Sequence, residues 1–358
     1  MSSTINLGNL SVSVFGESHG SAIGVVIDNL PAGKRLSIDR INEFMSRRAP
    51  KKDGTSTFRN EKDLPEIISG FYKGKTTGEA LCAVIKNSDQ HSSDYESIAS
   101  LARPGHADFT GYSRYNKSND MRGGGHFSGR LTAPLVFAGA VCEQFLLSLG
   151  ITTAAHIYSI GQEKDCAFDP VNISEELMHE IKTRYLPLID TSADEKMRAV
   201  IDNARENKDS VGGIVECAAV GIPVGTGSPI FDGLENRISQ VVFAVPAVKG
   251  IEFGAGFEAA SLFGSQNNDE FYMDGDRVMT RTNNAGGILG GISDGMPLIF
   301  RTAIKPTPSI AKAQNTVDFV KKEDAVIEIK GRHDPCIVPR SVPCIEAALN
   351  IALMSYFC

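Results

Sequence analysis

The stretch TAPLVFAGAVCEQFLLSL, residues 132–149, determines how the rest of the chain has to be arranged. It is apolar nearly all the way round a helix, with Pro134 near its start and Gly150 just after its end. Proline favours the first turn of a helix, and glycine favours the position just past its end. Because a helix without a polar face has to be buried on every side, we expect other elements to cover it.

On the N-terminal side, residues 11–15 and 23–27 have the pattern of strands on either side of a glycine-rich turn, which predicts a hairpin. Ser37 then predicts the N-cap of a helix with Arg47 and Arg48 in its last turn. Cations in the last turn are favourable for the helix dipole, so a purely structural role remains open for this pair.

A second pair of strands is expected within residues 66–90, followed by a long polar stretch with little periodicity over residues 88–130. Loops of that length are uncommon unless they are functional. Helices and strands do not alternate regularly along the chain, which favours an α+β fold with antiparallel sheets over a doubly wound parallel sheet. Further helices are predicted around residues 174–186, 194–208, 232–244 and 342–356, and strands at 213–220, 297–304 and 325–330.

The length of 358 residues allows one large domain or two ordinary ones. No linker, charge block or repeat marks a boundary, so we expect a single domain over residues 1–358. Hydrophobic residues make up 42% and charged residues 22%, the balance of an ordinary globular protein. The net charge of −7 argues against general nucleic-acid binding, so an anionic ligand has to meet a local group of arginines.

The chain has neither an uninterrupted run of about 18 apolar residues nor a leader with a basic start, so we expect no membrane span and a cytoplasmic location. The seven cysteines are odd in number and form no Cys-x-x-Cys pair. They are expected to be reduced thiols, with neither a disulfide framework nor a metal site.

Three short patterns resemble known functional motifs but lack the surroundings that these motifs need. Residues 16–20, GESHG, match the hydrolase nucleophile elbow, but a strand and not a helix is expected after them, so a Ser18 hydrolase is a minor alternative. Residues 70–76, GFYKGKT, are one residue short of a phosphate loop. Residues 254–259, GAGFEA, resemble a dinucleotide fingerprint without a βαβ unit around it.

Histidines recur in three glycine-containing segments far apart in the sequence, and the second and third also carry an arginine: GESHG at 16–20, RPGHAD at 103–108 and GRHDP at 331–335. RGGGHFSGR at 122–130 lies directly before the apolar stretch, where its glycines offer backbone N–H groups at a helix N-terminus. Arginines make bidentate contacts to carboxylates and phosphates. These segments predict a site for a phosphorylated, multiply anionic ligand. KPTPS at 305–309 suits an anion as well as it suits a plain turn after a strand.

The order of these motifs resembles the chorismate synthase family over essentially the whole chain. The resemblance implies a β-α-β sandwich, in which helices pack between antiparallel sheets, and a homotetramer. It rests on FGESHG at 15–20, RPGHAD at 103–108, RGGG at 122–125, AGGILGGIS at 285–293, KPTPS at 305–309 and GRHDPC at 331–336.

The resemblance also implies an activity, the 1,4-anti elimination of phosphate from 5-enolpyruvylshikimate 3-phosphate to give chorismate. Reduced FMN is then required as a transient electron donor, although the reaction has no net redox change. No NADPH site is evident in the sequence, so the flavin is expected to depend on an external reductant.

Residue roles follow from the same resemblance, position by position. His106 would protonate or stabilise the leaving phosphate, His19 would serve the N1 region of the flavin, and Asp334 would help the flavin N5 to remove the substrate proton. The substrate anions are assigned to Arg48, Arg130 and Arg340. Contacts to the flavin are assigned to His126, Phe127, Ser128, Ala247, Gly290, Lys305, Pro306, Thr307, Pro308, Ser309 and Arg332.

One segment departs from the family's pattern. Many members read GGGRSSARET where this chain has GGGHFSGRLT at 123–132. His126 and Phe127 therefore replace a cation and a hydroxyl, while Ser128 and Arg130 are retained. Because of this departure, a flavin- or nucleotide-binding module without catalysis is the alternative from another functional class.

Overall fold

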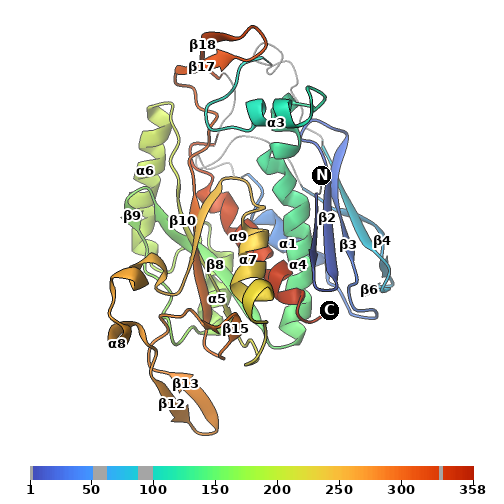
Figure 1. The fold of residues 1–358 in the computed structure, drawn as a ribbon. Helices are drawn as coiled ribbons and strands as arrows, with labels where there is room; N and C mark the ends of the chain where they lie inside the picture. The colour runs from blue at the N-terminus through green and yellow to red at the C-terminus, as the bar shows by residue number, and fades with distance from the viewer. Residues whose placement is uncertain (1–2, 51–62, 88–99, 330–333) are drawn as a thin grey trace.

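Two five-stranded antiparallel sheets lie on either side of a layer of helices in the computed structural model of the chain (Figure 1). The structure describes residues 3–50, 63–87, 100–329 and 334–358. The α+β class and the β-α-β sandwich expected from the sequence are confirmed.

The first sheet has the strand order β1-β2-β3-β7-β4. Both hairpins predicted from the sequence are present in it, since β2 pairs with β3 and β4 pairs with β7. Val25 and Ile27 of β3 are buried while Val26 between them is partly exposed, so one face of the sheet packs on the helices. The strands are β1 (Thr4–Leu7), β2 (Leu10–Gly16), β3 (Ala22–Asp28), β7 (Leu81–Lys86) and β4 (Glu66–Ser69), with the small hairpin β5 (Phe71–Tyr72) and β6 (Lys75–Thr76) between β4 and β7.

The second sheet has the order β11-β16-β10-β8-β9. The predicted strands at 213–220 and 297–304 are confirmed as β10 and β16, whereas β8 and β11 were not predicted. The strands are β11 (Val248–Phe253), β16 (Leu298–Ile304), β10 (Gly213–Val220), β8 (Thr152–Ile160) and β9 (Glu163–Lys164).

The apolar stretch forms helix α4 (Thr132–Ser148), which lies between the first sheet and helix α9 (Val338–Met354). α9 in turn packs on β8 and β10 of the second sheet. The two helices touch backbone to backbone, because a Cβ atom at Gly139 would lie only 2.3 Å from Cα of Ala347. The helix Gly129–Ser148 is long and apolar enough to cross a membrane, but 83% of its apolar window is buried inside the protein, as in the core helix of a globular domain.

Two further helices complete the inner layer, α1 (Ile38–Ser46) against α4 and α7 (Leu234–Val242) against α9. Ser37 is the N-cap of α1, as predicted. The prediction that Arg47 and Arg48 lie in the last turn of this helix is wrong, because the helix ends at Ser46 and both arginines turn to carboxylates instead. α9 begins four residues before the predicted position, since proline is tolerated in a first turn whose N–H groups have no helical partner.

The remaining elements lie outside the sandwich. Helix α3 (Asp108–Arg114) and the hairpin β17 (Gln314–Asp318)–β18 (Glu323–Ile327) form a cap above the N-terminal end of α4 (Figure 1). At the opposite end, the hairpin β12 (Phe271–Asp274)–β13 (Arg277–Thr280) projects as an arm. The others are α5 (Glu175–Thr183), α6 (Asp194–Glu206), α8 (Gly264–Asn267), β14 (Ile288–Leu289) and β15 (Ile292–Ser293).

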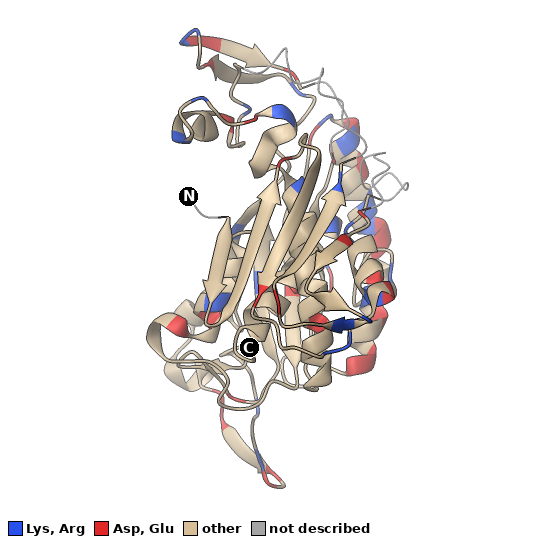
Figure 2. Ribbon diagram, turned by 90° about the vertical axis from the view of Figure 1, so that its right-hand side faces the viewer, with Lys and Arg blue, Asp and Glu red and all other residues tan. Residues whose placement is uncertain are grey.

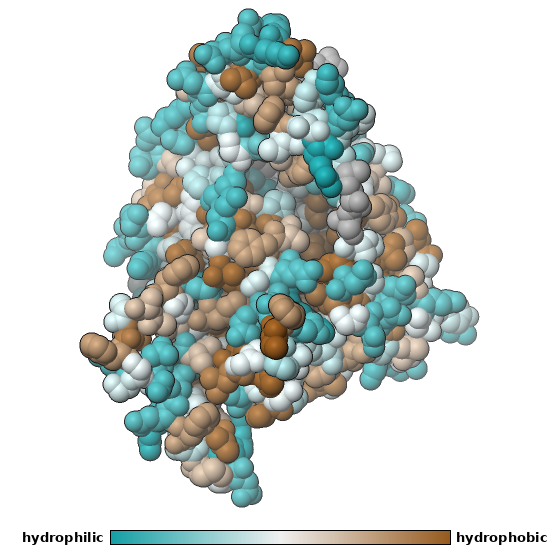
Figure 3. Space-filling view, viewed as in Figure 1, coloured by the Kyte–Doolittle hydropathy of each residue, from teal (hydrophilic) through white to brown (hydrophobic). Residues whose placement is uncertain are grey.

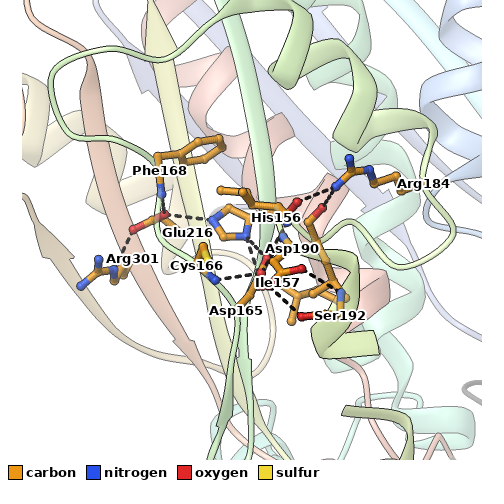
Figure 4. Close-up of polar contacts among 12 residues, drawn as sticks. His156, Ile157, Asp165, Cys166, Phe168, Arg184, Asp190, Ser192, Glu216 and Arg301 are labelled. Carbon is orange, nitrogen blue, oxygen red and sulfur yellow. Dashed lines mark hydrogen bonds and ion pairs between the residues drawn. The ribbon is translucent and has the colours of Figure 1, made fainter. Parts of the chain in front are cut away.

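A charged cluster is buried where α5 covers the outer face of the second sheet (Figure 4). His156 of β8 is completely buried, with Nε2 2.9 Å from Glu216 and Nδ1 3.2 Å from Asp165. Arg301 donates to the other oxygen of Glu216 from the neighbouring strand at 2.8 Å. Although burial opposes it, the hydrogen bonds that the ring donates to the two carboxylates raise the pKa of His156, which favours an imidazolium between two anions.

Candidate active site

A cavity of about 700 Å³ opens at the N-terminal ends of α4 and α9, beneath the cap. Volumes of this size are typical of small-molecule and cofactor sites. It is lined by residues from seven separate stretches of the described chain, namely the β1–β2 hairpin, Arg48 just after α1, the segments 103–107, 123–135, 241–247 and 305–309, and the start of α9 with Asp334.

Most of the residues expected to bind a ligand meet in this cavity. Of the predicted site residues, Arg48, His106, His126, Phe127, Ser128, Arg130, Ala247, Lys305, Thr307, Pro308, Ser309, Asp334 and Arg340 line it. Pro306 and Gly290 are not among the lining residues, and Gly290 lies in the turn between β14 and β15. Arg332 lies outside the described residues.

Each of the four arginines in the wall is paired with an aspartate. Asp63 accepts hydrogen bonds from Arg48 through one carboxylate oxygen and from Arg130 through the other. Burial by itself would raise the pKa of Asp63, but the guanidinium groups of Arg48 and Arg130 hold it below its usual range. Asp63 therefore holds two like charges side by side in the interior.

Both arginines that share Asp63 are also held by neutral acceptors. Arg48 Nε donates to Oγ1 of Thr132 at 2.8 Å, and Arg130 Nε donates to Oδ1 of Asn87 at 3.0 Å. The amide of Asn87 in turn donates to the carbonyl oxygen of Gly20 at 2.8 Å. The GESHG turn is thereby tied to the arginine pair, so the first glycine-rich segment supports the cavity wall.

His106 belongs to a second ion-paired group. Its Nδ1 lies 2.7 Å from Oδ1 of Asp108, and Arg103 donates to both oxygens of the same carboxylate at 2.7 Å. Although burial opposes it, hydrogen bonds from Arg103 and His106 hold the pKa of Asp108 well below its usual range. Asp108 is therefore ionised at neutral pH and can only accept.

Three successive glycines make room for both histidines that were assigned to catalysis. Gly123, Gly124 and Gly125 all have positive φ angles, of 60°, 87° and 54°. A Cβ atom at Gly123 would lie 2.5 Å from the ring of His19, and one at Gly124 would lie 3.1 Å from Nε2 of His106. His19 is buried behind Gly123 and does not line the cavity. Because glycine has no side chain, only the backbone of Gly123 lies between His19 and the cavity.

The two residues that depart from the family's pattern have defined partners. His126 Nδ1 lies 2.8 Å from the carbonyl oxygen of Gly16, and its Nε2 lies 2.8 Å from Oγ of Ser3. The Phe127 ring packs in a tilted arrangement on Tyr115, with 6.1 Å between ring centroids. His126 therefore joins the N-terminal strand to the GESHG turn, and Phe127 joins the cavity wall to the cap.

The 305–309 segment supplies polar groups to the cavity wall. Lys305 Nζ donates to the carbonyl oxygen of Gly105 at 2.8 Å, and burial, together with the charge of Lys249, lowers its pKa. Oγ1 of Thr307 is buried and has no hydrogen-bond partner among the described residues. Buried hydroxyls are normally paired, so an unpaired one in a cavity wall indicates a place for a polar ligand group.

Sequence reasoning missed two aspartates that pair with the cations of the cavity wall, Asp63 and Asp108. Asp108 was present in the RPGHAD motif, but no role was assigned to it, and Asp63 was not singled out at all. The spacing of Asp108, two residues from a histidine and five from an arginine, is a signal that could have pointed to it. Asp63 gave no such signal, because its partners lie 15 and 67 residues away.

A smaller cavity of about 270 Å³ lies between α1, α5 and α9 and shares Arg340 with the first. Its cations Arg47 and Lys182 are both paired with the buried carboxylate of Glu346 at 2.7 Å. It therefore offers less charge to an anion than the larger cavity does.

Comparison with known proteins points to one family. The family model described as chorismate synthase matches residues 10–358. Chorismate synthase of Dehalococcoides mccartyi is 45% identical over 349 residues, which cover 97% of this chain and 95% of the relative. That of Methanocaldococcus jannaschii is 45% identical over 353 residues, covering 96% and 93%. A crystal structure of chorismate synthase superposes with a TM-score of 0.77 at 31% identity, over 98% of this chain and 92% of the other.

Proposed function

The chain belongs to the chorismate synthase family, and we propose that the 700 Å³ cavity is the active site in which it performs this family's reaction. The protein is a chorismate synthase of the shikimate pathway, a lyase that eliminates phosphate from 5-enolpyruvylshikimate 3-phosphate in the 1,4-anti sense to give chorismate. The observation that carries the site assignment is the meeting of His106, Asp334 and the arginines in one cavity.

The charge of the cavity suits this substrate, which carries two carboxylates and a phosphate. Four arginines and Lys305 line it, and three aspartates pair with the arginines, so positive charge is left in excess. Arg48, Arg130 and Arg340 are the proposed contacts for the substrate anions. In a partly buried site such charge–charge contacts are less screened than at a surface, which favours binding of the polyanion.

His106 is the proposed acid at the leaving phosphate. A proton on Nε2 can pass to a phosphate oxygen as the carbon–oxygen bond breaks, while Nδ1 keeps its proton against Asp108. His19, buried behind Gly123, is the proposed donor to the N1 region of the flavin. Asp334, whose Oδ2 accepts from Arg340 at 2.7 Å, is proposed to assist removal of the substrate proton.

The family uses a flavin, and we propose reduced FMN for this chain. When bound, the reduced flavin supplies a transient electron to the substrate. The cavity fits such a group, because its lining combines the apolar side chains of Val241, Val245 and Ala247 with the unpaired hydroxyl of Thr307 and the cation of Lys305. The proposed contacts that line the cavity are His126, Phe127, Ser128, Ala247, Lys305, Thr307, Pro308 and Ser309. Pro306, Gly290 and Arg332 are proposed from the family resemblance alone.

The flavin is proposed to be reduced by an external reductant, and the enzyme is proposed to act in the cytoplasm as a homotetramer.

Two surfaces of the described chain support the proposed homotetramer. The strands of the first sheet contain few charged residues (Figure 2), and apolar residues gather around the projecting arm (Figure 3). Phe271, Met273 and Val278 of the arm itself are exposed. Light scattering on the purified protein checks the tetramer, and NADPH oxidation by the protein with FMN would contradict the external reductant.

The decisive experiment is phosphate release under anaerobic conditions with reduced FMN and 5-enolpyruvylshikimate 3-phosphate. We expect turnover by the native chain, loss of turnover in His106→Ala with retained flavin binding, and native activity in His179→Ala, which removes an exposed histidine of α5. Flavin binding without any phosphate release by the native chain would favour the binding-module alternative. Phosphate release that survives His106→Ala would overturn the assignment of this cavity as the active site.

A further inference from the structure

The carboxylate of Asp108 lies against Nδ1 of His106, and this contact determines which ring nitrogen can act as the acid. We propose that Asp108 is the positioning residue of the reaction, holding the Nδ1 proton of His106 so that Nε2 is the nitrogen presented to the leaving phosphate. The inference deepens the proposed function, because it takes His106 as the acid.

The tautomer follows from the hydrogen bond. Oδ1 of Asp108 lies 2.7 Å from Nδ1 of His106, and an ionised carboxylate can only accept, so Nδ1 has to carry a proton. The other neighbour of the ring, Nη2 of Arg103, lies 3.1 Å from Nδ1 and 3.3 Å from Nε2. A donor aligned with one ring nitrogen would be much farther from the other, so Arg103 does not select a tautomer and Asp108 does.

The carboxylate is itself held in one orientation. Its Oδ2 accepts from the backbone N–H of Arg103 at 3.1 Å and from Nε of the same residue at 2.7 Å, and its Oδ1 accepts from Nη2 at 2.7 Å. With three donors from one arginine, Asp108 cannot rotate without losing several bonds. Because Arg103 holds the carboxylate of Asp108 in one orientation, the carboxylate also holds the ring of His106 in one orientation.

Nε2 of His106 faces the triple-glycine segment on the side away from Asp108. A Cβ atom at Gly124 would lie 3.1 Å from Nε2, so the absence of a side chain there leaves space beside this nitrogen. The nitrogen that Asp108 leaves unoccupied is therefore the one with room for a phosphate oxygen.

Asp108→Asn tests the proposal because the amide has only one accepting oxygen. Arg103 can only donate, so the amide oxygen is expected to stay at the Oδ2 position and the NH2 group to face Nδ1 of His106. The ring then has to accept at Nδ1 and carry its proton on Nε2, the opposite tautomer. The readout is the ¹⁵N spectrum of histidine-labelled, FMN-bound protein at a pH where the ring is neutral, with the His106 signals assigned by their loss in His106→Gln.

We expect the tautomer to switch and kcat for phosphate release to fall by about 100-fold or more, with KM little changed. Asp318→Asn is the matched control, because Asp318 is equally buried in the cap, where it bonds Ser100 and two backbone N–H groups and lies outside the cavity. It is expected to keep the native tautomer and kcat.

Asp108→Glu keeps the charge and serves if the asparagine variant does not fold. It is expected to keep the Nδ1 proton while lowering kcat, because the longer side chain displaces the ring. A native tautomer together with native kcat in Asp108→Asn, or native kcat in Asp108→Glu, would overturn the proposal. Turnover that survives His106→Gln would instead overturn the proposed function on which it rests.

Discussion

The ring of Phe127 fills the space beside the backbone of Gly111, so closely that a Cβ atom at position 111 would lie 2.6 Å from Cε2 of the ring. Gly111 is in the middle of α3, at the base of the cap, and Phe127 lines the cavity. Phe127, one of the two residues that depart from the family's pattern, is therefore fitted to a glycine on the facing helix, and the pair joins the cap to the proposed active site.

Gly111→Ala is expected to destabilise the protein only while the Phe127 ring is present. Alanine favours a helix over glycine by about 1 kcal/mol, but the clash with the ring is expected to lower the free energy of unfolding by about 1–3 kcal/mol. In a Phe127→Ala background the same change should be neutral or stabilising. Urea unfolding of the four proteins of this cycle measures the difference, and an equal loss in both backgrounds would contradict the contact.

Asp63→Asn is expected to destabilise the protein strongly, because Arg48 and Arg130 would be left side by side without their shared carboxylate. Loss of one partner from a buried ion pair costs about 3–5 kcal/mol in the free energy of unfolding. Sulfate should recover part of this loss by binding between the two guanidinium groups. Asp209→Asn breaks the exposed pair with Lys312 and should cost no more than about 1 kcal/mol. Equal losses in the two variants would contradict the role of Asp63.

Much of the fold could be predicted because it depends on local patterns. The unbroken apolar run of α4 required coverage on all sides, and the strand at 213–220 was predicted at its observed bounds. β8 was missed because both of its faces are buried, with His156 held in the charged cluster, so no alternation of exposed and buried residues marks it.

The site was predictable only as a set of ligand-binding residues. The arginines, histidines and glycines of the motifs predicted an anion site, and His106, Arg130 and Lys305 do line one cavity. The pairing of these cations could not be predicted, because Asp63 and its partners meet through tertiary packing and not through spacing. Gly290 was assigned to the flavin from its motif, but it lies in the turn after β14 and outside the cavity lining. A motif alone does not tell at which end of the molecule its residues lie.

The buried His156 cluster is expected to make stability depend on pH. The raised pKa of His156 adds stability that is full below its unfolded value of about 6.5 and is lost as pH rises through the folded value. The lowered pKa values of Asp165 and Glu216 act in the opposite sense, adding stability above their unfolded values of about 4 that is lost as pH falls. Arg301, the other charge facing Glu216, does not titrate in this range.

The melting temperature should therefore be highest between about pH 5 and pH 6.5 and decline on the alkaline side. His156→Gln should lower the melting temperature and remove the alkaline decline that the imidazolium causes. His179→Gln, at an exposed position on α5, is the control and should leave the profile unchanged. An alkaline decline that persists unchanged in His156→Gln would place its cause outside this cluster.

Gly124→Ala is expected to separate catalysis from binding of the flavin. Gly124 has φ of 87°, which strains any other residue, and its Cβ would lie 3.1 Å from Nε2 of His106, in the space proposed for the leaving phosphate. A displacement of about 1 Å at a reacting group can cost about 100-fold in rate, so kcat for phosphate release should fall by that order while the Kd for FMN stays near the native value. Gly129→Ala is the matched control five residues on, because nothing lies within 4 Å of its Cβ and its φ is not positive. Phosphate release and flavin fluorescence measure the two quantities, and equal loss of activity in both variants would show that any added side chain in this segment disturbs the site, whatever it does to His106.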